Sequence, residues 1–427
     1  MTPGILDPGS VSRRAYLKSA VAAGGSVGLA ACVDRFDSNG GLEDVPQGDP
    51  ETVPSRQHAW NEFLPTDDHG NVRPPRHHVL GYVDLADGVD PEETQEPFAD
   101  ALADLEQAFE WSNEGLLFTV GYSPSYFDRF DADLPDAVDL PAPESLSDLE
   151  EPELDRTDLL IHLASDRPDA VIEAEEALVG DAETANGQEV TDVTDLLERV
   201  DRRTGFVGAG LPQENRDVSG VPDDAPIPEE APLFMGFMNG FREAQASEDR
   251  VTIEEGPFEG ATTEHVSTIE FQLRDWWHQE NHFQRVAKMF SPTHADDDLV
   301  GEHGERFDSD PRVAEVAEDV LETASQRGVV GHAQKAASAR VDGEPILLRR
   351  DFDSTDDDRA GLHFLSLQRE IADFVRVREA ITGAALADET SVGRRVNNGI
   401  LQYFFVRRRA NALVPPRPLR SFPRPDP

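Results

Sequence analysis

Apolar and polar residues follow each other along the chain in an order that occurs twice. Runs that alternate with period two predict strands, and apolar residues spaced three or four apart predict helices. The first copy predicts strands at 79–85, 116–121, 159–164 and about 205–208, with helices that begin near residue 97 and after residue 168. The second copy predicts a strand through 269–273, helices at 276–290 and 311–324, strands at 346–350 and 362–367, a helix with Ile371, Phe374 and Ile381 on one face, and a strand at 402–405.

This order is strand-helix-strand-strand-helix-strand, the ferredoxin-like unit, repeated in tandem. We therefore predict an α+β fold in which two such units bring their sheets together, bury a core and form a dimeric, barrel-like α+β structure. The predicted boundary divides the folded chain into a first half at 77–240 and a second half at 241–427.

The first residues carry the pattern of an export signal. Ser12-Arg13-Arg14-Ala15-Tyr16-Leu17-Lys18 is typical of a twin-arginine signal, and a small-residue apolar run then leads to Cys32. Residues 1–32 are therefore predicted to be the signal, with lipidation of Cys32 after cleavage; cleavage nearby without a lipid is the alternative. Because Cys32 is the only cysteine, no disulfide can form within the chain. Residues 33–76, rich in Asp, Gly and Pro, are predicted to be a disordered acidic tether.

The charge of the chain limits its surroundings and partners. It has 85 acidic and 38 basic residues, which gives a formal charge of −47. Such a charge is self-repulsive at ordinary ionic strength and is tolerated in strong salt, which screens it, so the composition is typical of a halophile's protein. The same charge disfavours nucleic acid and an anionic membrane surface as partners. No run after the signal is apolar enough to span a bilayer, so a membrane contact is expected only through the lipid.

Three segments near the C-terminus combine the residue types of a haem pocket. They are Gly331-His332-Ala333-Gln334-Lys335, Ile346-Leu347-Leu348-Arg349-Arg350 and Gly361-Leu362-His363-Phe364-Leu365. The last two are predicted to be antiparallel strands joined by a turn-rich acidic linker at 351–359, with Leu362 and Phe364 on one face. A histidine can be an axial iron ligand, an arginine a distal cation, and leucine with phenylalanine a dry wall.

In this order and spacing, the segments resemble the dye-decolorising peroxidase family and its exported, deferrochelatase-like branch, as a divergent member of haloarchaeal type. The similarity runs from about residue 78 to residue 405. It implies haem b as the cofactor, with His332 as the axial ligand of the haem iron. Arg349 would be the catalytic distal cation, and Leu362 and Phe364 would line the haem pocket.

The chain departs from the family pattern at three positions. Asp351 replaces the glycine that follows the two arginines, and Gln334 replaces the usual arginine two places after the histidine. The third departure is in Gly236-Phe237-Met238-Asn239-Gly240, where the family has an aspartate over the iron and this chain has Asn239. An amide can hold peroxide or water by hydrogen bonds but cannot take up a proton. Proton transfer is therefore expected to pass through water near Arg349, or to be slow.

The resemblance implies an exported haem peroxidase that reduces hydrogen peroxide with electrons from an unknown donor. Export by the twin-arginine pathway and lipidation would leave it anchored at the extracellular face of the cell membrane; a homo-oligomer is possible on this sequence. Two alternative functions stay open. One is a non-catalytic haem or iron-handling lipoprotein, which Asn239 favours, and the other is a haem-free binding lipoprotein on the same fold.

His278 and His282 suggest a different site. Two histidines at this spacing lie on one face of a helix and can bind zinc. However, Gln279 stands where a zinc protease requires glutamate, and the candidate third ligands, His294 and His303, lie in an acidic loop. We therefore interpret the pair as part of an exposed helix face.

Overall fold

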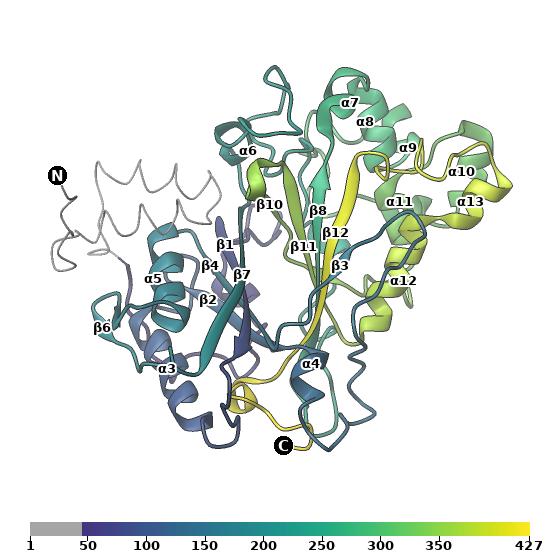
Figure 1. Ribbon diagram of the computed structural model, residues 1–427. Coiled ribbons are helices and arrows are strands. Elements are labelled where there is room, and N and C mark those ends of the chain that lie inside the picture. Colours follow the sequence, from purple (N-terminus) through teal and green to yellow (C-terminus); the bar gives the residue numbers. More distant parts are fainter. Residues whose placement is uncertain (1–44) are drawn as a thin grey trace, which may run out of the picture.

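In the computed structural model, which describes residues 45–427, both predicted copies are present and together form one barrel (Figure 1). The first copy consists of β1 (His77–Leu85), α3 (Gln95–Ala108), β2 (Leu117–Tyr122), β4 (Leu159–Ser165), α5 (Pro168–Val179) and β7 (Leu197–Phe206). The second copy is built on β8 (Thr262–Phe271), β9 (Leu348–Arg349), β11 (Gly361–Gln368), α12 (Ile371–Thr382) and β12 (Phe404–Val414). The remaining helices and strands are α4 (Pro124–Phe127), β3 (Glu153–Leu154), β5 (Thr184–Ala185), β6 (Gln188–Glu189), α6 (Leu211–Glu214), α7 (Leu273–His278), α8 (His282–Met289), α9 (Pro292–Asp296), α10 (Val320–Arg327), α11 (His332–Ala337), β10 (Phe352–Ser354) and α13 (Ala384–Glu389).

The strand order in each copy is that of a ferredoxin-like unit. It is β7-β1-β4-β2 in the first copy and β12-β8-β11-β9 in the second, so each sheet runs from its fourth strand to its first, third and second. The two sheets join because β2 pairs with β12, and because β10 pairs with both β7 and β11. The ring β10-β7-β1-β4-β2-β12-β8-β11 is thereby closed. The predicted α+β fold, with two tandem ferredoxin-like units in a barrel, is confirmed.

Strands such as β1, β2 and β4 are buried on both faces because their alternate side chains enter different cores. On β1, Val79 and Val83 pack in the core under α3 and α5, whereas Leu80 and Tyr82 face the barrel interior. In Figure 1, helices of the first copy flank one side of the barrel and helices of the second copy flank the other. This leaves a layer between the second sheet and its helices, and that layer contains the candidate site.

β10 lies within the segment that the sequence analysis assigned to a linker. Phe352, Asp353 and Ser354 pair with β11, and Asp353 also pairs with Phe206 of β7. Three residues are too few to produce a period-two pattern, and their strand conformation comes from partners distant in sequence. The predicted antiparallel neighbours on either side of this segment, β9 and β11, are confirmed.

Two predicted helices of the second copy are each divided. The helix expected at 276–290 is divided into α7 and α8 because Asn281 caps a new helix. The Asn281 side chain accepts a hydrogen bond from the Gln284 backbone N–H, and the Gln284 side chain accepts one from the Asn281 backbone N–H. The helix expected at 311–324 is a short 3₁₀ turn at Val313–Val316 followed by α10. The strand expected through residue 273 ends at Phe271, and Leu273 begins α7.

The prediction of a disordered tether is wrong for residues 45–76, which pack on the barrel. Trp60 is fully buried, and its indole N–H donates to the Gln57 carbonyl at 2.8 Å. The Gln57 amide in turn donates to the carbonyls of Val120 and Pro415. The segment lacks periodicity because contacts with distant residues order it, not a helix or strand of its own. The predicted signal with Arg13, Arg14 and Cys32, and the start of the predicted tether, lie outside the described residues.

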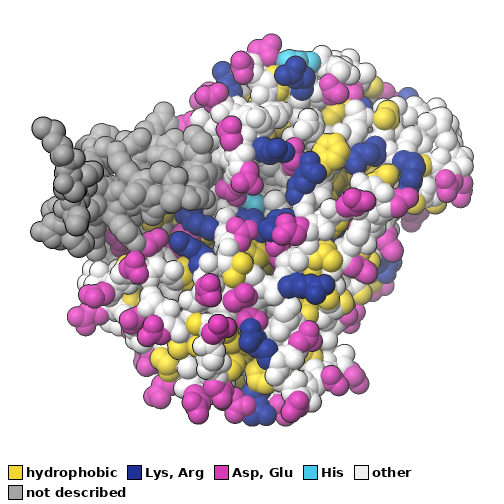
Figure 2. All heavy atoms as spheres, in the orientation of Figure 1, with side chains coloured by type: hydrophobic (Ala, Val, Ile, Leu, Met, Phe, Trp, Pro, Cys, Tyr) yellow, Lys and Arg dark blue, Asp and Glu magenta, His cyan; other side chains and the backbone are white. Residues whose placement is uncertain are grey.

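The surface reflects the acidic composition. Figure 2 shows Asp and Glu side chains spread over this face of the molecule, with Arg and Lys between them. Several arginines pair with carboxylates, for example Arg56 with Asp249 and Arg312 with Glu315. Within residues 45–427, no helix is both long enough and apolar enough to cross a membrane.

Candidate functional site

A cavity of about 160 Å³ lies between the sheet of the second copy and the helices that cover it, and we call it the inner cavity. This volume is roughly ten times what one water molecule requires. Most of its wall is apolar, and the apolar residues from the strands and from α12 are Ile269, Phe271, Leu362, Phe364, Phe374, Val377, Ile381, Phe404 and Val406. The polar side chains on its border include His332, Arg349, Asp351, Asp353 and Asn239. An apolar pocket with a few convergent polar groups is typical of a ligand or cofactor site.

His332 is the first residue of α11 and points its ring into this layer. The preceding Gly331 lies so close to the end of α8 that a Cβ there would meet the Phe290 carbonyl oxygen at 1.7 Å, so only glycine fits. Burial, with Lys335 and Arg349 nearby, lowers the pKa of His332 to about 3. The ring is therefore neutral at ordinary pH and keeps the lone pair that a metal ligand needs. Its Nδ1 is buried and has no hydrogen-bond partner among residues 45–427.

The space around His332 continues past the inner cavity. A second cavity of about 120 Å³, which we call the helix-side cavity, borders α11 and the start of β9. His332, Arg349 and Phe364 border both cavities. A flat ligand wider than either cavity would therefore have space on both sides of His332. The residues present fit a haem, since they combine one unpartnered neutral histidine, an apolar wall and a fixed cation.

Arg349, Asp351 and Asp353 occupy alternate positions of one segment, and all three border the inner cavity. The residues between them face the barrel interior: the Arg350 guanidinium lies 4.0 Å over the Trp60 ring, and the Phe352 ring stacks on His78. Period-two alternation of an extended backbone produces this division. Arg350 therefore faces away from Arg349.

β11 alternates in the same way. Leu362 and Phe364 border the inner cavity, as the sequence analysis expected of the two apolar residues of the candidate pocket. His363 points to the opposite face, where its Nε2 lies 3.2 Å from Asp356. The structure thus brings together all of the pocket residues that were predicted from the C-terminal segments.

Asn239 reaches the same place from a loop of the first half. Gly236 has a positive φ of 80°, and a Cβ there would lie 2.5 Å from the Trp277 ring, so glycine is required at this turn. The Met238 backbone N–H donates to the His303 carbonyl at 2.7 Å, which holds the loop. Asn239 then borders the inner cavity and also a third cavity.

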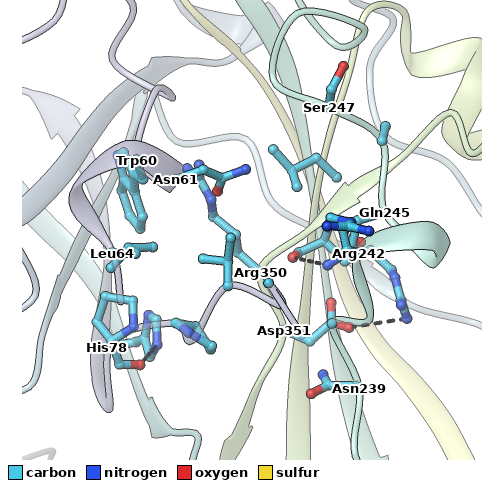
Figure 3. Close-up of a pocket in the computed structure, with 18 residues that line it drawn as sticks. Trp60, Asn61, Leu64, His78, Asn239, Arg242, Gln245, Ser247, Arg350 and Asp351 are labelled. Carbon is cyan, nitrogen blue, oxygen red and sulfur yellow. Dashed lines mark hydrogen bonds and ion pairs between the residues drawn. The ribbon is translucent and has the colours of Figure 1, made fainter. Parts of the chain in front are cut away.

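This third cavity, which we call the outer cavity, has a volume of about 280 Å³. Figure 3 shows Trp60, Leu64 and His78 on one wall, with Asp351 and Asn239 on the other. The ordered N-terminal segment therefore forms part of the site, which the sequence analysis missed because it expected that segment to be a tether. Asn239, Arg349 and Asp351 border both the outer and the inner cavity.

Two buried carboxyl groups follow Arg349 on the same face of this segment. Arg349 Nη1 is 3.7 Å from Asp351 Oδ2, and Asp351 Oδ1 is buried without a hydrogen-bond partner in the described chain. Burial raises the pKa of Asp351 to about 6, although the positive charge of Arg349 acts in the opposite direction. Burial also raises the pKa of Asp353 well above its ordinary value, although the Phe234 backbone N–H donates to its side chain.

From the sequence, Asp351 was predicted only as a replacement for glycine, and no role was predicted for Asp353. The alternation of Arg349, Asp351 and Asp353 was a usable signal, since charged residues at every second position share a face. This signal was obscured because the segment is rich in aspartate, and an aspartate in an acidic linker is expected to lie on the surface. Only burial separates these two carboxyl groups from the others.

The alternative histidine site does not form. His278 ends α7 and its Nε2 lies 2.9 Å from Asp224, whereas His282 begins α8 and its Nε2 lies 2.8 Å from the Gly301 carbonyl oxygen. The two histidines do not share one helix face, because the chain leaves the helix between them. His294 is bonded to Ser291 and Pro311. In the part of the chain that the structure describes, no three His, Cys, Asp or Glu side chains are grouped to hold a metal ion.

Solved structures with the same architecture are dye-decolorising peroxidases. A variant of DypB from Rhodococcus jostii RHA1 in complex with haem is 14% identical, with a TM-score of 0.53 over 86% of this chain and 99% of that one. DyPB from the same organism is 14% identical, with a TM-score of 0.52 over 82% and 96% of the two chains. The encapsulated DyP-type peroxidase from Mycobacterium smegmatis is 14% identical, with a TM-score of 0.51 over 86% and 100%. The protein therefore has the fold of the DyP-type peroxidases.

Within that fold class, the chain belongs to a family described as a family of unknown function (DUF7405), whose profile matches residues 75–416. No curated protein matches the chain.

Proposed function

We propose that the protein is a haem-dependent peroxidase that reduces hydrogen peroxide. The observation that carries the proposal is the largely apolar inner cavity, bordered by the unpartnered His332 ring and by Arg349. The likeness of the fold to DyP-type peroxidases, one of them in complex with haem, supports the same cofactor here. Haem b is the form that the sequence resemblance implies.

The haem, when bound, would supply the iron to which peroxide binds and the two electrons that break the O–O bond. The residues of the chain would supply everything else. A neutral ring nitrogen of His332 would hold the iron, and Leu362 and Phe364 would exclude water. The fixed positive charge of Arg349 would stabilise the negative charge that develops on the peroxide oxygens. The Asn239 amide would orient peroxide by hydrogen bonds.

Electrons would come from an unknown donor, and the predicted signal would determine the location. The twin-arginine pattern and Cys32 support export and a lipid anchor at the extracellular face of the cell membrane. Export in the folded state suits a protein that binds its cofactor before it leaves the cytoplasm.

The test is to express the protein with haem supplied, in strong salt, and to record its absorption spectrum and peroxide-dependent oxidation of a dye. We expect a haem band of a histidine-ligated iron together with dye oxidation that depends on peroxide. Absence of the haem band in the correctly folded protein would overturn the proposal.

A second candidate function is a haem-binding protein without catalysis. Asn239 favours it, because the position that the family gives to a carboxylate here carries an amide. A haem band without peroxide turnover would support this candidate in place of the peroxidase.

A further inference from the structure

We propose that Asp351 is the catalytic residue that moves the proton of hydrogen peroxide in this protein. The inference rests on the proposed function and assigns the proton transfer, for which position 239 provides only an amide. It starts from an unexplained feature of the site, a buried carboxyl group with an oxygen that lacks any partner in the described chain.

The position of Asp351 suits the task. It borders the inner cavity, where His332 would hold the haem, and also the larger outer cavity, from which a small substrate would arrive. Asn239 and Arg349 border both cavities as well. A peroxide at this boundary would therefore contact an amide, a fixed cation and a carboxyl group together.

The chemistry balances with this one group. The Asp351 carboxylate takes the proton from one oxygen of hydrogen peroxide and then returns the same proton to the other oxygen. That second oxygen leaves as water when the O–O bond breaks, with the two electrons that a bound haem would supply. Arg349 stabilises the charge while the proton is on Asp351. No other proton donor is required for this step.

The charged and titratable groups around Asp351 are compatible with its role as a proton acceptor and donor. Arg349 of β9 lies beside it, and Asp353 of β10 follows on the same face. Across the inner cavity are His332 of α11 and Arg378 of α12, and the outer cavity adds His78, Arg242 and Arg350. Burial disfavours the carboxylate form, whereas the positive charge of Arg349 and a hydrogen bond with the Leu365 backbone favour it, so the pKa of Asp351 rises only to about 6. The base form is then present above about pH 6.

Asp353 is the natural control. It is the other carboxyl group on the inner cavity, but it does not border the outer cavity. Burial raises its pKa well above the ordinary value. Its Oδ2 accepts a hydrogen bond from the Phe234 backbone N–H, although its Oδ1, like that of Asp351, has no hydrogen-bond partner in the described chain. Asp353→Asn should therefore keep the rise in rate near pH 6, whereas Asp351→Asn should remove it.

The activity test is stopped-flow reaction of the haem-loaded protein with peroxide. Asp351→Asn should lower the rate by about 10²-fold or more with haem content unchanged, and the rise in rate near pH 6 should disappear. Asn239→Asp, added to the Asp351→Asn variant, should restore part of the rate, because it puts a carboxylate on the border of the same two cavities. A purely structural role of Asp351 would not be rescued in this way.

An independent readout uses the haem-free protein. Infrared spectra over a pH series should show a carboxylic acid band that is lost as pH rises through about 6, and this part of the signal should be absent from Asp351→Asn but present in Asp353→Asn. An unchanged rate in Asp351→Asn, with normal turnover of the unsubstituted protein, would overturn the inference alone. Failure of the unsubstituted protein to bind haem or to reduce peroxide would overturn the proposed function and this inference together.

Discussion

The guanidinium of Arg349 lies 3.7 Å from the carboxylate of Asp351, at the boundary between the inner and outer cavities. The two side chains differ in exposure, at 29% for Arg349 and 6% for Asp351, so water reaches the cation more easily than the carboxylate. The pair is therefore poorly suited to stabilise the fold, but it is well suited to control the pKa of the Asp351 carboxyl group. Arg349 limits the rise in the pKa of Asp351 that burial causes.

Arg349→Leu is predicted to slow the reaction with peroxide by about 10²-fold, because a preorganised positive charge beside developing negative charge is lost. The pKa of Asp351 should also rise, so the midpoint of the pH–rate profile should move above about 6. Stopped-flow measurements over a pH series check both effects. Arg349→Lys keeps a positive charge, so its rate should lie between those of the unsubstituted protein and Arg349→Leu. Equal rates for all three proteins would contradict the role of the charge.

Asp351→Asn is predicted to change how the stability of the haem-free protein depends on pH. The pKa of Asp351 rises from 3.8 to about 6 on folding, so the native state binds this proton more tightly than the unfolded state. Its contribution to stability is present at low pH and is lost as pH rises through about 6, which costs up to about 3 kcal/mol. Asparagine is neutral throughout and avoids this loss. The variant should therefore gain stability relative to the unsubstituted protein as pH rises from about 4 to about 6, and the gain should stay constant above that range.

Denaturant unfolding at constant high salt measures this difference. Asp353→Asn is the matched control, because it removes the neighbouring buried carboxyl group, whose pKa is also raised, and leaves Asp351 in place. The stability of that variant should still fall as pH rises through about 6. A parallel pH dependence for Asp351→Asn and the unsubstituted protein would show that Asp351 does not titrate near pH 6.

His332→Ala is predicted to lose haem, since a methyl group cannot replace an axial nitrogen ligand. His278→Ala and His282→Ala should keep it, because these residues contact Asp224 and the Gly301 carbonyl outside the cavity. The ratio of haem absorbance to protein, measured after gel filtration, distinguishes the variants. A normal haem spectrum in His332→Ala would remove the central claim about the iron ligand.

Trp60→Ala is predicted to destabilise the protein by about 3–5 kcal/mol, although the residue belongs to the segment that the sequence describes as a tether. The side chain is fully buried, and Arg350 stacks on its ring. Asp68→Ala, at an exposed position of the same segment, should change the free energy of unfolding by no more than about 0.5 kcal/mol. Removal of residues 1–76 should lower the unfolding midpoint sharply.

Cys32→Ser is predicted to release the protein from the membrane fraction, because the lipid would be its only attachment. Cell fractionation followed by detection of the protein in membrane and soluble pools measures this. Equal partitioning of the variant and the unsubstituted protein would contradict lipidation at this residue.

The sequence by itself determined the parts of the fold whose signals are local. The period-two runs that became β1 and β11, and the helical stripe of α12, can be seen within ten or so residues because each element has to bury one face of its own. The order of these elements was enough to predict two ferredoxin-like units. The grouping of His332 with Arg349, Leu362 and Phe364 in one pocket was likewise predictable, because the three C-terminal segments that contain these residues occur in the order and spacing of a known family.

Only the tertiary structure decided which polar residues are removed from water, and this determines the chemistry of the site. Residues 45–76 are ordered through side-chain contacts such as those of Gln57 and Trp60 with strands far along the chain, and β10 is held by partners on two sheets. Asp351 resembles the many surface aspartates until closure of the barrel places it between two cavities beside Arg349. Burial is a property of the whole packed chain, so a pKa of about 6 for this carboxyl group could not be read from its neighbours in sequence.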